Sequence, residues 1–413
     1  MNHKLSILIA PLHYCPNPQD GSEYTRAYDY LTALSEYKNV SGDVLVAYMQ
    51  ENKIGNLNIH AMLGSKPQYI SILLRLRFIF WVYVKGLLLL SKNHYDLLWH
   101  NGPFAIGETF NILLLSSARK VATVIGPIVA PHTFLAADEG RSMGRKSYSS
   151  DFFLKLTRII DSVFYKFKSL SQNLSNHTLQ RASLVVAKDH ASLDLLSSLQ
   201  LKKLTRLTIG SDTTSFLSKP RKLLKRNKYK VISVGYLVRR KDFVTVIAAF
   251  NHLVNILNYR QAELNIIGDG PELNNLEKLV KKYSLNEYVK FIGHVPKHII
   301  GTYYKESDLF VSGSISESMP AMYLEAMASS LPMVIASNAT SIELASDNFG
   351  GSVVPEKNAI RMAEAIYLLL TNSDLYNNYS SSNYSLYRSK YNFTKQISKL
   401  IKLLYKSSEA YKI

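Results

Sequence analysis

Glu317 and Glu325 are the residues whose type and spacing suggest chemistry most directly, because they stand eight positions apart around the start of an expected helix at 319–330. Carboxyl groups that flank one scissile bond, as in a retaining glycosidase, lie about 5 Å apart. Eight residues of helix at roughly 1.5 Å per residue separate these two by on the order of 12 Å. The pair therefore fits the two ends of one long ligand, with a solvated helix surface as the open alternative.

Short elements around the pair would position it. Residues 319–330 are rich in helix formers, and Pro320 suits the first helical turn. Apolar residues at 310–311 and 333–336 predict buried strands on either side. The unpaired N–H groups at the start of such a helix would face the loop at 316–319, where an anion such as phosphate could bind.

Three consecutive cations, Arg239, Arg240 and Lys241, follow a predicted strand at 230–234 and Gly235. Arginine contacts phosphate oxygens in a bidentate manner and lysine acts as a point charge, so the run suits a diphosphate. A solvated turn is the alternative for the same three residues.

Glycines mark two further loops that follow predicted strands. Gly268 and Gly270 stand between a strand and a helix, where they serve either a tight turn or the close approach of a nucleotide. Gly21 and Ser22 follow the first strand. They would bring backbone N–H groups to a phosphate, or Ser22 would cap the next helix.

The length of 413 residues predicts two domains of about 200 residues each. The apolar fraction of 47% is typical of a folded globular protein. A single cysteine, Cys15, excludes an internal disulfide and fits a reducing, cytoplasmic setting. No His or Cys cluster has metal-ligand spacing, so no metal site is expected.

The net charge of +18 requires an anionic partner or surface. Thirteen Lys or Arg and two Asp fall within 201–250. The densest part, 219–230, lacks a core period and is interpreted as a linker. A nucleic acid is one possible anion, but no recognised nucleic-acid module is present in the sequence, which disfavours it.

Apolar runs alternate with helical patterns along the chain, which predicts parallel sheets of the doubly wound kind. The expected strands are 5–10, 44–48, 97–100, 121–125 and 184–187 in the first half, and 230–234, 264–267 and 289–292 in the second. Two such series predict two Rossmann-like domains that face each other, with a ligand in the crevice at the carboxyl ends of the strands.

Amphipathic segments complete the pattern. The apolar period in 382–413 predicts a C-terminal helix that packs on the body of the protein. Segments 70–90 and 151–170 interleave large apolar residues with Lys and Arg. Each is either a core-facing helix or a basic face that lies on anionic lipid. No uncharged run in the chain reaches the roughly 20 residues of a membrane span, and the apolar run near the N-terminus is too short for a signal peptide.

The order of these motifs resembles family GT4 of the retaining glycosyltransferases, which have the GT-B fold. The resemblance is strong over 230–370, where SVGYLVRRKD, NIIGDGPELNNLE, VKFIGHVPK and ESMPAMYLEAMASSLPMV follow one another, the last with an E-x7-E pattern. It is weaker over 1–218. The resemblance implies an N-terminal acceptor-binding domain at 1–218, a nucleotide-sugar-binding domain at 219–385, and a helix at 386–413 that crosses back to the first domain.

The resemblance also implies roles for single residues. Glu317 would lie by the donor sugar, and Glu325 would hold the ribose hydroxyls. Lys241, with Arg240 or Arg239, would hold the diphosphate. Further donor contacts are implied for Gly21, Ser22, Gly235, Gly268, Gly270, Ser318, Met319 and Pro320.

Two positions depart from the family pattern. Tyr236 stands where an arginine often follows the strand's glycine, so that phosphate contact either comes from Arg239 or Arg240 or is missing. Gly126-Pro127 stands where a histidine is often found. His132, six residues on, is the candidate acceptor contact, with a surface loop histidine as the alternative.

The sequence thus predicts an enzyme that moves a hexose or related sugar from a UDP- or GDP-linked donor to a glycan or lipid-linked glycan, with retention of configuration and without a cofactor or metal. The family is typically employed in bacterial cell-surface polysaccharide synthesis, such as that of capsule or lipopolysaccharide. The expected location is the cytoplasm or the inner face of the cell membrane, in peripheral contact with anionic lipid. A non-catalytic GT-B scaffold that binds a sugar nucleotide or glycan is the alternative.

Overall fold

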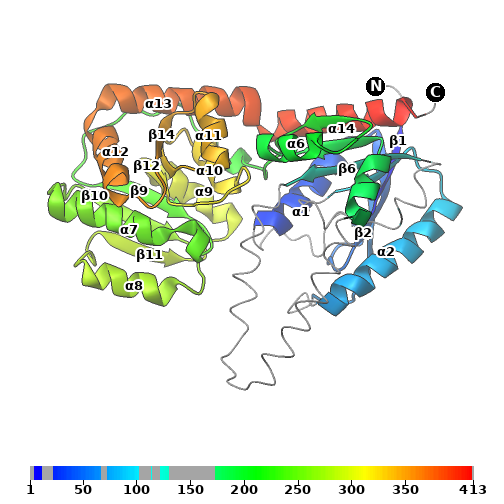
Figure 1. The fold of residues 1–413 in the computed structure, drawn as a ribbon, viewed down its shortest axis with the longest axis horizontal. Coiled ribbons are helices and arrows are strands. Elements are labelled where there is room, and N and C mark those ends of the chain that lie inside the picture. Colours follow the sequence, from blue (N-terminus) through cyan, green and yellow to red (C-terminus); the bar gives the residue numbers. More distant parts are fainter. Residues whose placement is uncertain are drawn as a thin grey trace, which may run out of the picture. The chain divides into compact units, whose positions relative to one another are not determined.

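The computed structural model describes residues 4–11, 22–66, 72–101, 113, 121–129 and 173–411. The chain divides into two compact units (Figure 1). Unit 1 ends at Ser211 and takes in the chain again from Thr394, and unit 2 comprises Asp212–Phe393. The polypeptide therefore passes from unit 1 into unit 2 and returns at its C-terminal helix.

Unit 1 contains a sheet with the strand order β3-β4-β2-β1-β5-β6-β7-β8. Its neighbouring strands are parallel except for β3 and β4. The strands are β1 (Leu5–Ile9), β2 (Val40–Val46), β3 (Lys53–Ile54), β4 (Leu57–Ala61), β5 (Leu97–His100), β6 (Ala122–Ile128), β7 (Leu184–Ala187) and β8 (Leu204–Arg206). The helices include α1 (Ser22–Ser35), α2 (Ile72–Lys92), α6 (His190–Ser197) and α14 (Phe393–Glu409).

Helix α2 covers one face of this sheet. Its buried residues Phe78, Val82 and Leu89 share a core with Leu8 of β1 and Leu45 of β2. Among the described residues, no helix is both long enough and apolar enough to cross a bilayer.

Unit 2 contains a parallel sheet with the order β11-β10-β9-β12-β13-β14. Its strands are β9 (Tyr229–Val234), β10 (Ala262–Ile267), β11 (Val289–Gly293), β12 (Leu309–Ser312), β13 (Met333–Ala336) and β14 (Gly351–Val354). The helices are α7 (Phe243–Asn251), α8 (Leu273–Lys282), α9 (Lys297–Glu306), α10 (Ala321–Ala328), α11 (Ala339–Ser346), α12 (Ala359–Thr371) and α13 (Ser373–Leu386).

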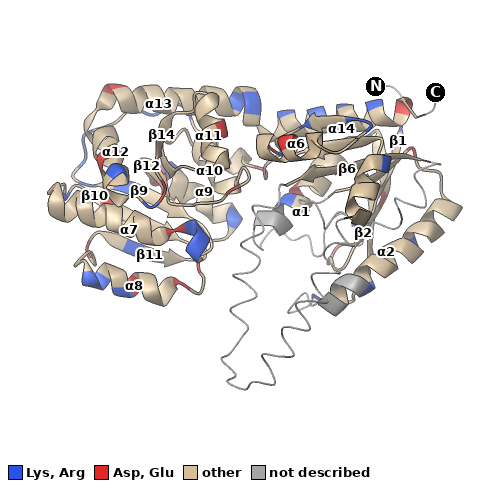
Figure 2. Ribbon diagram, in the orientation of Figure 1, with Lys and Arg blue, Asp and Glu red and all other residues tan. Residues whose placement is uncertain are grey.

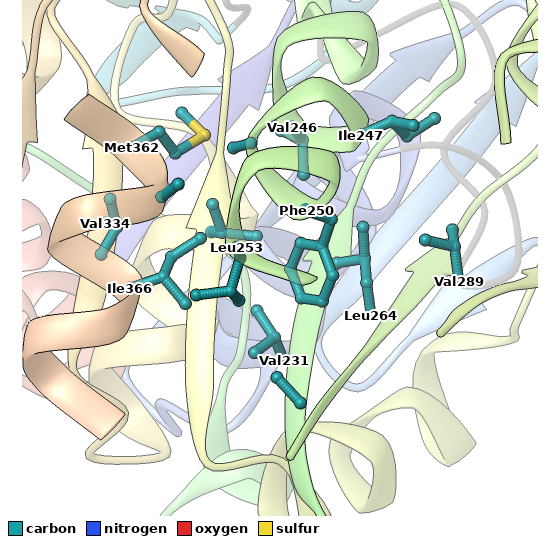
Figure 3. Packing of buried hydrophobic residues seen from close by; sticks show 14 of the residues in the cluster. Val231, Val246, Ile247, Phe250, Leu253, Leu264, Val289, Val334, Met362 and Ile366 are labelled. Atoms are coloured by element: carbon teal, nitrogen blue, oxygen red, sulfur yellow. The ribbon is translucent and has the colours of Figure 1, made fainter. Parts of the chain in front are cut away.

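The core of unit 2 forms between the sheet and helices α7 and α12. Figure 3 shows Phe250 and Leu253 next to Val231 of β9, with Met362 and Ile366 of α12 completing the layer. Apolar residues at helical spacing along α7 supply its inward face, so this helix is held against the strands by burial of apolar surface. The core fixes the carboxyl ends of β9, β10 and β12 as a rigid platform.

Residues 219–230, interpreted above as a linker, pack against unit 2. The guanidinium of Arg221 donates hydrogen bonds of 2.6–3.1 Å to backbone carbonyls at the ends of α9 and α10. The last carbonyls of a helix lack partners within it and form its negative end, so a cation suits them. The four acceptors are Tyr304, Lys305, Ser307 and Ser329. Unit 2 spans Asp212–Phe393, whereas the expected second domain spans 219–385, so both include this segment.

Candidate functional site

Three loops of unit 2 meet at the carboxyl edge of its sheet, because β10, β9 and β12 are neighbours in it. Gly268 and Gly270, after β10, have φ angles of 138° and 155°, and a Cβ at either position would overlap backbone atoms of the loop after β9. A Cβ at Gly313, after β12, would likewise overlap the carbonyl oxygen of Asp242. Contact between loops explains why these positions are glycine, and a donor contact at Gly268 or Gly270 stays a prediction.

A buried ion pair joins two of these loops. The Nζ atom of Lys241 donates a hydrogen bond to Oε1 of Glu317, and neither side chain is more than one-tenth exposed. The Lys241 side chain lies beside Gly235, where a Cβ would be in ordinary contact with its Cδ and Cε atoms at 3.6 Å. The side chain of Asp242 caps α7 by accepting a hydrogen bond from the Thr245 amide, which fixes the end of the loop that carries Lys241.

The three consecutive cations separate in the structure. The Nη1 atom of Arg240 lies 3.7 Å from Oε1 of Glu317 and 3.4 Å from the Ser316 carbonyl oxygen. The exposed side chain of Arg239 instead places its Nε 3.7 Å from Oε1 of Glu272. Of the two arginines left open above, Arg240 therefore accompanies Lys241 at Glu317.

Electrostatics at the pair favour a further anion. The pKa of Lys241 lies below its ordinary value of 10.5, because burial disfavours the charged form. The Glu317 carboxylate acts in the opposite direction, whereas the Arg240 guanidinium lowers the pKa further. An anion placed beside both cations would relieve part of their mutual repulsion.

The helix that follows is shorter than expected. Helix α10 begins at Ala321, not at 319, because Met319 has a left-handed backbone with φ of 42° and Pro320 is extended as its N-cap. Glu317 thus lies in the preceding loop. The separation of about 12 Å, which assumed one continuous helix, does not apply to Glu317 and Glu325.

Thr340 of α11 holds the bend before α10. Its buried hydroxyl accepts a hydrogen bond of 2.9 Å from the Met319 amide and donates one of 2.8 Å to the Glu317 carbonyl oxygen. Asn338, the N-cap of α11, donates from its side chain to the Ser314 carbonyl oxygen at 2.8 Å. Sequence analysis missed both residues, although an Asn ahead of a helix is an N-cap signal.

The bend also limits which backbone groups can contact a ligand. Pro320 has no N–H, and the amide of Met319 is bonded to Thr340. An α-helix leaves its first N–H groups without carbonyl partners, so α10 offers the amides of Ala321 and Met322. At Met319 and Pro320, the expected backbone contacts with a ligand therefore cannot come from an N–H group. At Ser318 the expected contact stays a prediction.

Glu325 is buried on α10 and contacts Tyr304 of α9. Burial raises the pKa of Tyr304 well above its ordinary value, and the Glu325 carboxylate, a hydrogen-bond partner of its hydroxyl, raises it further. Tyr304 also lies against Phe310 and Phe216, with ring centroids 6.2 and 5.4 Å away. Tyr304 thus positions the carboxylate, and no sequence pattern pointed to this role.

Some of the residues with predicted contacts are not among those that the structure describes. Gly21, His132 and the segment 151–170 lie outside the described residues, and of Ser22 the structure describes only its place at the start of α1. Tyr236, at the place of the expected arginine, is exposed. Among the described residues, no group of three or more His, Cys, Asp or Glu could hold a metal ion.

A family model described as glycosyl transferases group 1 matches residues 216–386, which include all three loops of the site. This segment is similar to the glycosyl transferases of group 1. The expectation drawn from the motifs at 230–370 is thereby confirmed.

Relatives match part of the chain. Over 139 residues it is 27% identical to an alpha-monoglucosyldiacylglycerol synthase of Acholeplasma laidlawii, with 34% of each chain covered. Over 174 residues it is 28% identical to the putative colanic acid biosynthesis glycosyltransferase WcaL of Escherichia coli, covering 40% of this chain and 41% of WcaL. The chain thus spans less than half of the length of these relatives.

Solved structures resemble the whole chain. A sucrose-phosphate synthase of Thermosynechococcus elongatus superimposes with a TM-score of 0.71 at 15% identity, covering 99% of this chain and all of the other. HepE of Anabaena, in complex with UDP and glucose, gives 0.65 at 15% identity, with 97% and 100% covered. The predicted GT-B fold, with its C-terminal helix returning to the first unit, is confirmed.

Proposed function

We propose that the chain is a retaining glycosyltransferase that moves a sugar from a UDP- or GDP-linked donor to a glycan or lipid-linked glycan acceptor. The observation that carries this proposal is the buried pair of Lys241 and Glu317, with Arg240 beside it, at the carboxyl edge of the group 1 domain. Ligands of open α/β sheets bind at that edge.

The donor would lie along the three loops. Lys241, Arg240 and the first N–H groups of α10 would face the diphosphate, Glu317 the sugar, and Glu325 the ribose hydroxyls. Without a ligand, the Glu317 carboxylate compensates the positive charge of Lys241. A bound diphosphate would provide part of this compensation instead. Cations and a helix N-terminus supply this compensation in the proposal, so no metal is required.

The chemical step would break the bond between the sugar C1 and the diphosphate oxygen. Preorganised cations stabilise the negative charge that develops on this leaving group. The acceptor hydroxyl would attack C1 from the same face, and its proton would pass to a diphosphate oxygen. The new glycosidic bond then keeps the configuration of the donor.

Names of similar proteins support the choice of substrates. HepE was solved with UDP and glucose, which supports a nucleotide-linked sugar as donor. The relatives named above are an alpha-monoglucosyldiacylglycerol synthase and a putative colanic acid biosynthesis glycosyltransferase. A lipid-linked glycan of the bacterial cell surface is the acceptor that we propose on this basis, at the inner face of the cell membrane.

Helix α2 supports contact with such a membrane. Phe80 and Leu88 are 65% and 51% exposed, and Val84 and Leu87 are exposed on the same side at helical spacing. No acidic residue occurs in α2, whose ribbon lacks red in Figure 2, while Lys and Arg occur at 75, 77, 85 and 92. A basic helix with exposed apolar residues suits the interface of an anionic bilayer, which we propose as its partner.

The activity can be tested with a panel of UDP-, GDP- and ADP-linked sugars, with and without vesicles that contain phosphatidylglycerol and diacylglycerol. We expect the nucleoside diphosphate to be released from one donor class, and release to fall at least about 100-fold in Lys241→Met. Lys290→Met is the matched control, because Lys290 is an exposed lysine paired with Glu263 away from the site. Donor binding without release from any sugar nucleotide would instead indicate a non-catalytic scaffold.

A further inference from the structure

Arg26 of α1 is a buried arginine with a hydrogen-bond donor that has no acceptor. Arg26 is only 6% exposed, and its Nε atom has no hydrogen-bond partner. No ion pair joins its guanidinium to an acid among the described residues. Burial of a cation without a partner is costly, and buried charges are normally paired or bind a ligand.

A second unpaired polar group lies along the same contact. Tyr30, one turn after Arg26, donates a hydrogen bond of 3.1 Å to the Ile209 carbonyl oxygen. Two residues beyond Ile209, the hydroxyl of Ser211 is buried at 3% exposure and has no hydrogen-bond partner. Burial raises the pKa of Tyr30 and the Arg26 charge opposes that shift, so the guanidinium lies close to this contact.

The topology of unit 1 places the start of α1 at a ligand-binding edge. Helix α1 connects β1 to β2, and these strands are parallel, so the helix runs opposite to them (Figure 1). Its N-terminal end therefore lies at the carboxyl edge of the sheet, where open α/β sheets bind ligands. The helix dipole adds positive potential at this end.

We propose that Arg26 is the anion-binding group of a second subsite, in unit 1, which takes a phosphate group of the acceptor. A guanidinium contacts two oxygens of an oxyanion at once. The Ser211 hydroxyl would supply a third donor, which suits a tetrahedral phosphate better than a planar carboxylate. The identity of the ligand as acceptor rests on the proposed transfer function, whereas the anion site itself does not.

The test compares full-length wild type, Arg26→Met, Arg26→Lys and Ser211→Ala in a buffer free of multivalent anions. Inorganic phosphate and glycerol 3-phosphate are titrated, the latter as the soluble counterpart of a lipid headgroup. We expect Arg26→Met to weaken phosphate binding at least tenfold, and to keep or raise the thermal midpoint without ligand, because it removes a buried Nε–H group that has no partner. A preference for glycerol 3-phosphate over inorganic phosphate would indicate a lipid headgroup as the source.

The other variants sharpen the outcome. Ser211→Ala should weaken phosphate binding severalfold without lowering the midpoint, and Arg26→Lys should bind more weakly than wild type because the two-oxygen contact is lost. Arg77→Met, on α2, is the control and should change neither quantity. All variants should bind a nucleoside diphosphate as wild type does, and a failure of wild type to bind one would contradict the proposed function but not this site. Unchanged phosphate affinity in Arg26→Met together with a lower midpoint would overturn the proposal.

Discussion

Lys241 remains a buried cation whose compensation depends on a single carboxylate. Glu317 opposes the lowering of the Lys241 pKa by burial, and Arg240 adds to it. A ligand with two phosphates offers this lysine more negative charge than Glu317 does. The protonation state of Lys241 is therefore the property of the site most sensitive to both pH and ligand.

Nucleotide binding should fall at alkaline pH as Lys241 loses its proton. Because its folded pKa lies below 10.5, we expect the affinity for a nucleoside diphosphate to decline with a midpoint below that value. In Glu317→Gln the midpoint should move to still lower pH, because the carboxylate that stabilises the charged form is absent. Titrations between pH 7 and 10 would measure this, with Lys241→Arg as the variant in which the decline should vanish. A midpoint unchanged by Glu317→Gln would contradict the electrostatic account.

His100, at the end of β5, should make folding stability depend on pH. Burial lowers its pKa from 6.5 to about 3, so the unfolded chain takes up a proton at a pH where the native state does not. Stability is then fully present above about pH 6.5 and is lost as pH falls towards 3, by about 2 kcal/mol between pH 7 and pH 5. Urea unfolding of His100→Asn should show a shallower loss than wild type. The exposed His94 gives the control His94→Asn, and equal pH profiles for wild type and His100→Asn would refute the prediction.

Residue types and spacing predicted part of this chemistry. Glu317 and Lys241 were recognised because acids and cations follow apolar strands, and the fold brings those strand ends together. Thr340 and Tyr304 carried no signal, since a hydroxyl becomes informative only when its partner is known. The burial of Arg26 is equally invisible in sequence, because it depends on tertiary packing.

At the scale of elements, the bend before α10 is the feature that orients the pair. Met319 adopts a left-handed backbone there, and Thr340 holds the residues on both sides of Ser318. The sequence pattern suggested a helix through 319, because helix propensity ignores a hydrogen bond from a side chain 21 residues further on. The strands that form apolar runs were predictable, whereas the short or less apolar strands β3, β4, β8 and β14 were not.

Thr340→Val should loosen this bend. The substitution preserves shape but leaves the Met319 amide and the Glu317 carbonyl without their buried partner, which costs about 1–3 kcal/mol. We expect lower stability in urea and a lower transfer rate, because Glu317 is less well held. Thr340→Ser keeps the hydroxyl and serves as the matched control. Wild-type stability and rate in Thr340→Val would show that the bend does not need this contact.

Helix α2 should bind anionic vesicles through its exposed apolar side. We expect the double variant Phe80→Ser, Leu88→Ser to lose most co-sedimentation with phosphatidylglycerol vesicles, because the residues proposed to enter the bilayer interface are removed. Phosphatidylcholine vesicles should bind the wild type more weakly, since the basic residues lack an anionic partner there. Ile342→Ser, at an exposed position on α11, is the control. Equal binding by the double variant, or dimerisation of wild type that the variant abolishes, would contradict a membrane role for this face.

For the whole molecule, the sequence alone predicts the net charge but not how every segment packs. The net charge of +18 was readable from composition, and Figure 2 shows Lys and Arg in both units, including along α14. The packing of 219–230 was not readable, because this segment resembles a solvated linker in composition. Arg221 in fact binds carbonyls at two helix ends, so the segment is part of unit 2.

The order of motifs explains why the fold was nonetheless predictable. Several weak sequence motifs in a fixed order over 230–370 together specified one domain architecture. Each loop taken alone also fitted an ordinary turn with no role in binding. The N-terminal half offered fewer such signals. Its parallel sheet followed from alternating apolar runs and helical patterns, whereas its ligand-binding residues did not.

Calorimetric titration with UDP, GDP and ADP would test whether unit 2 holds a nucleotide-sugar donor at Lys241 and Glu317. We predict saturable binding of one nucleoside diphosphate with one site per chain, weakened at least tenfold in Lys241→Met and unchanged in Lys290→Met. Absence of binding by all three nucleotides, or equal affinity in wild type and Lys241→Met, would contradict the account.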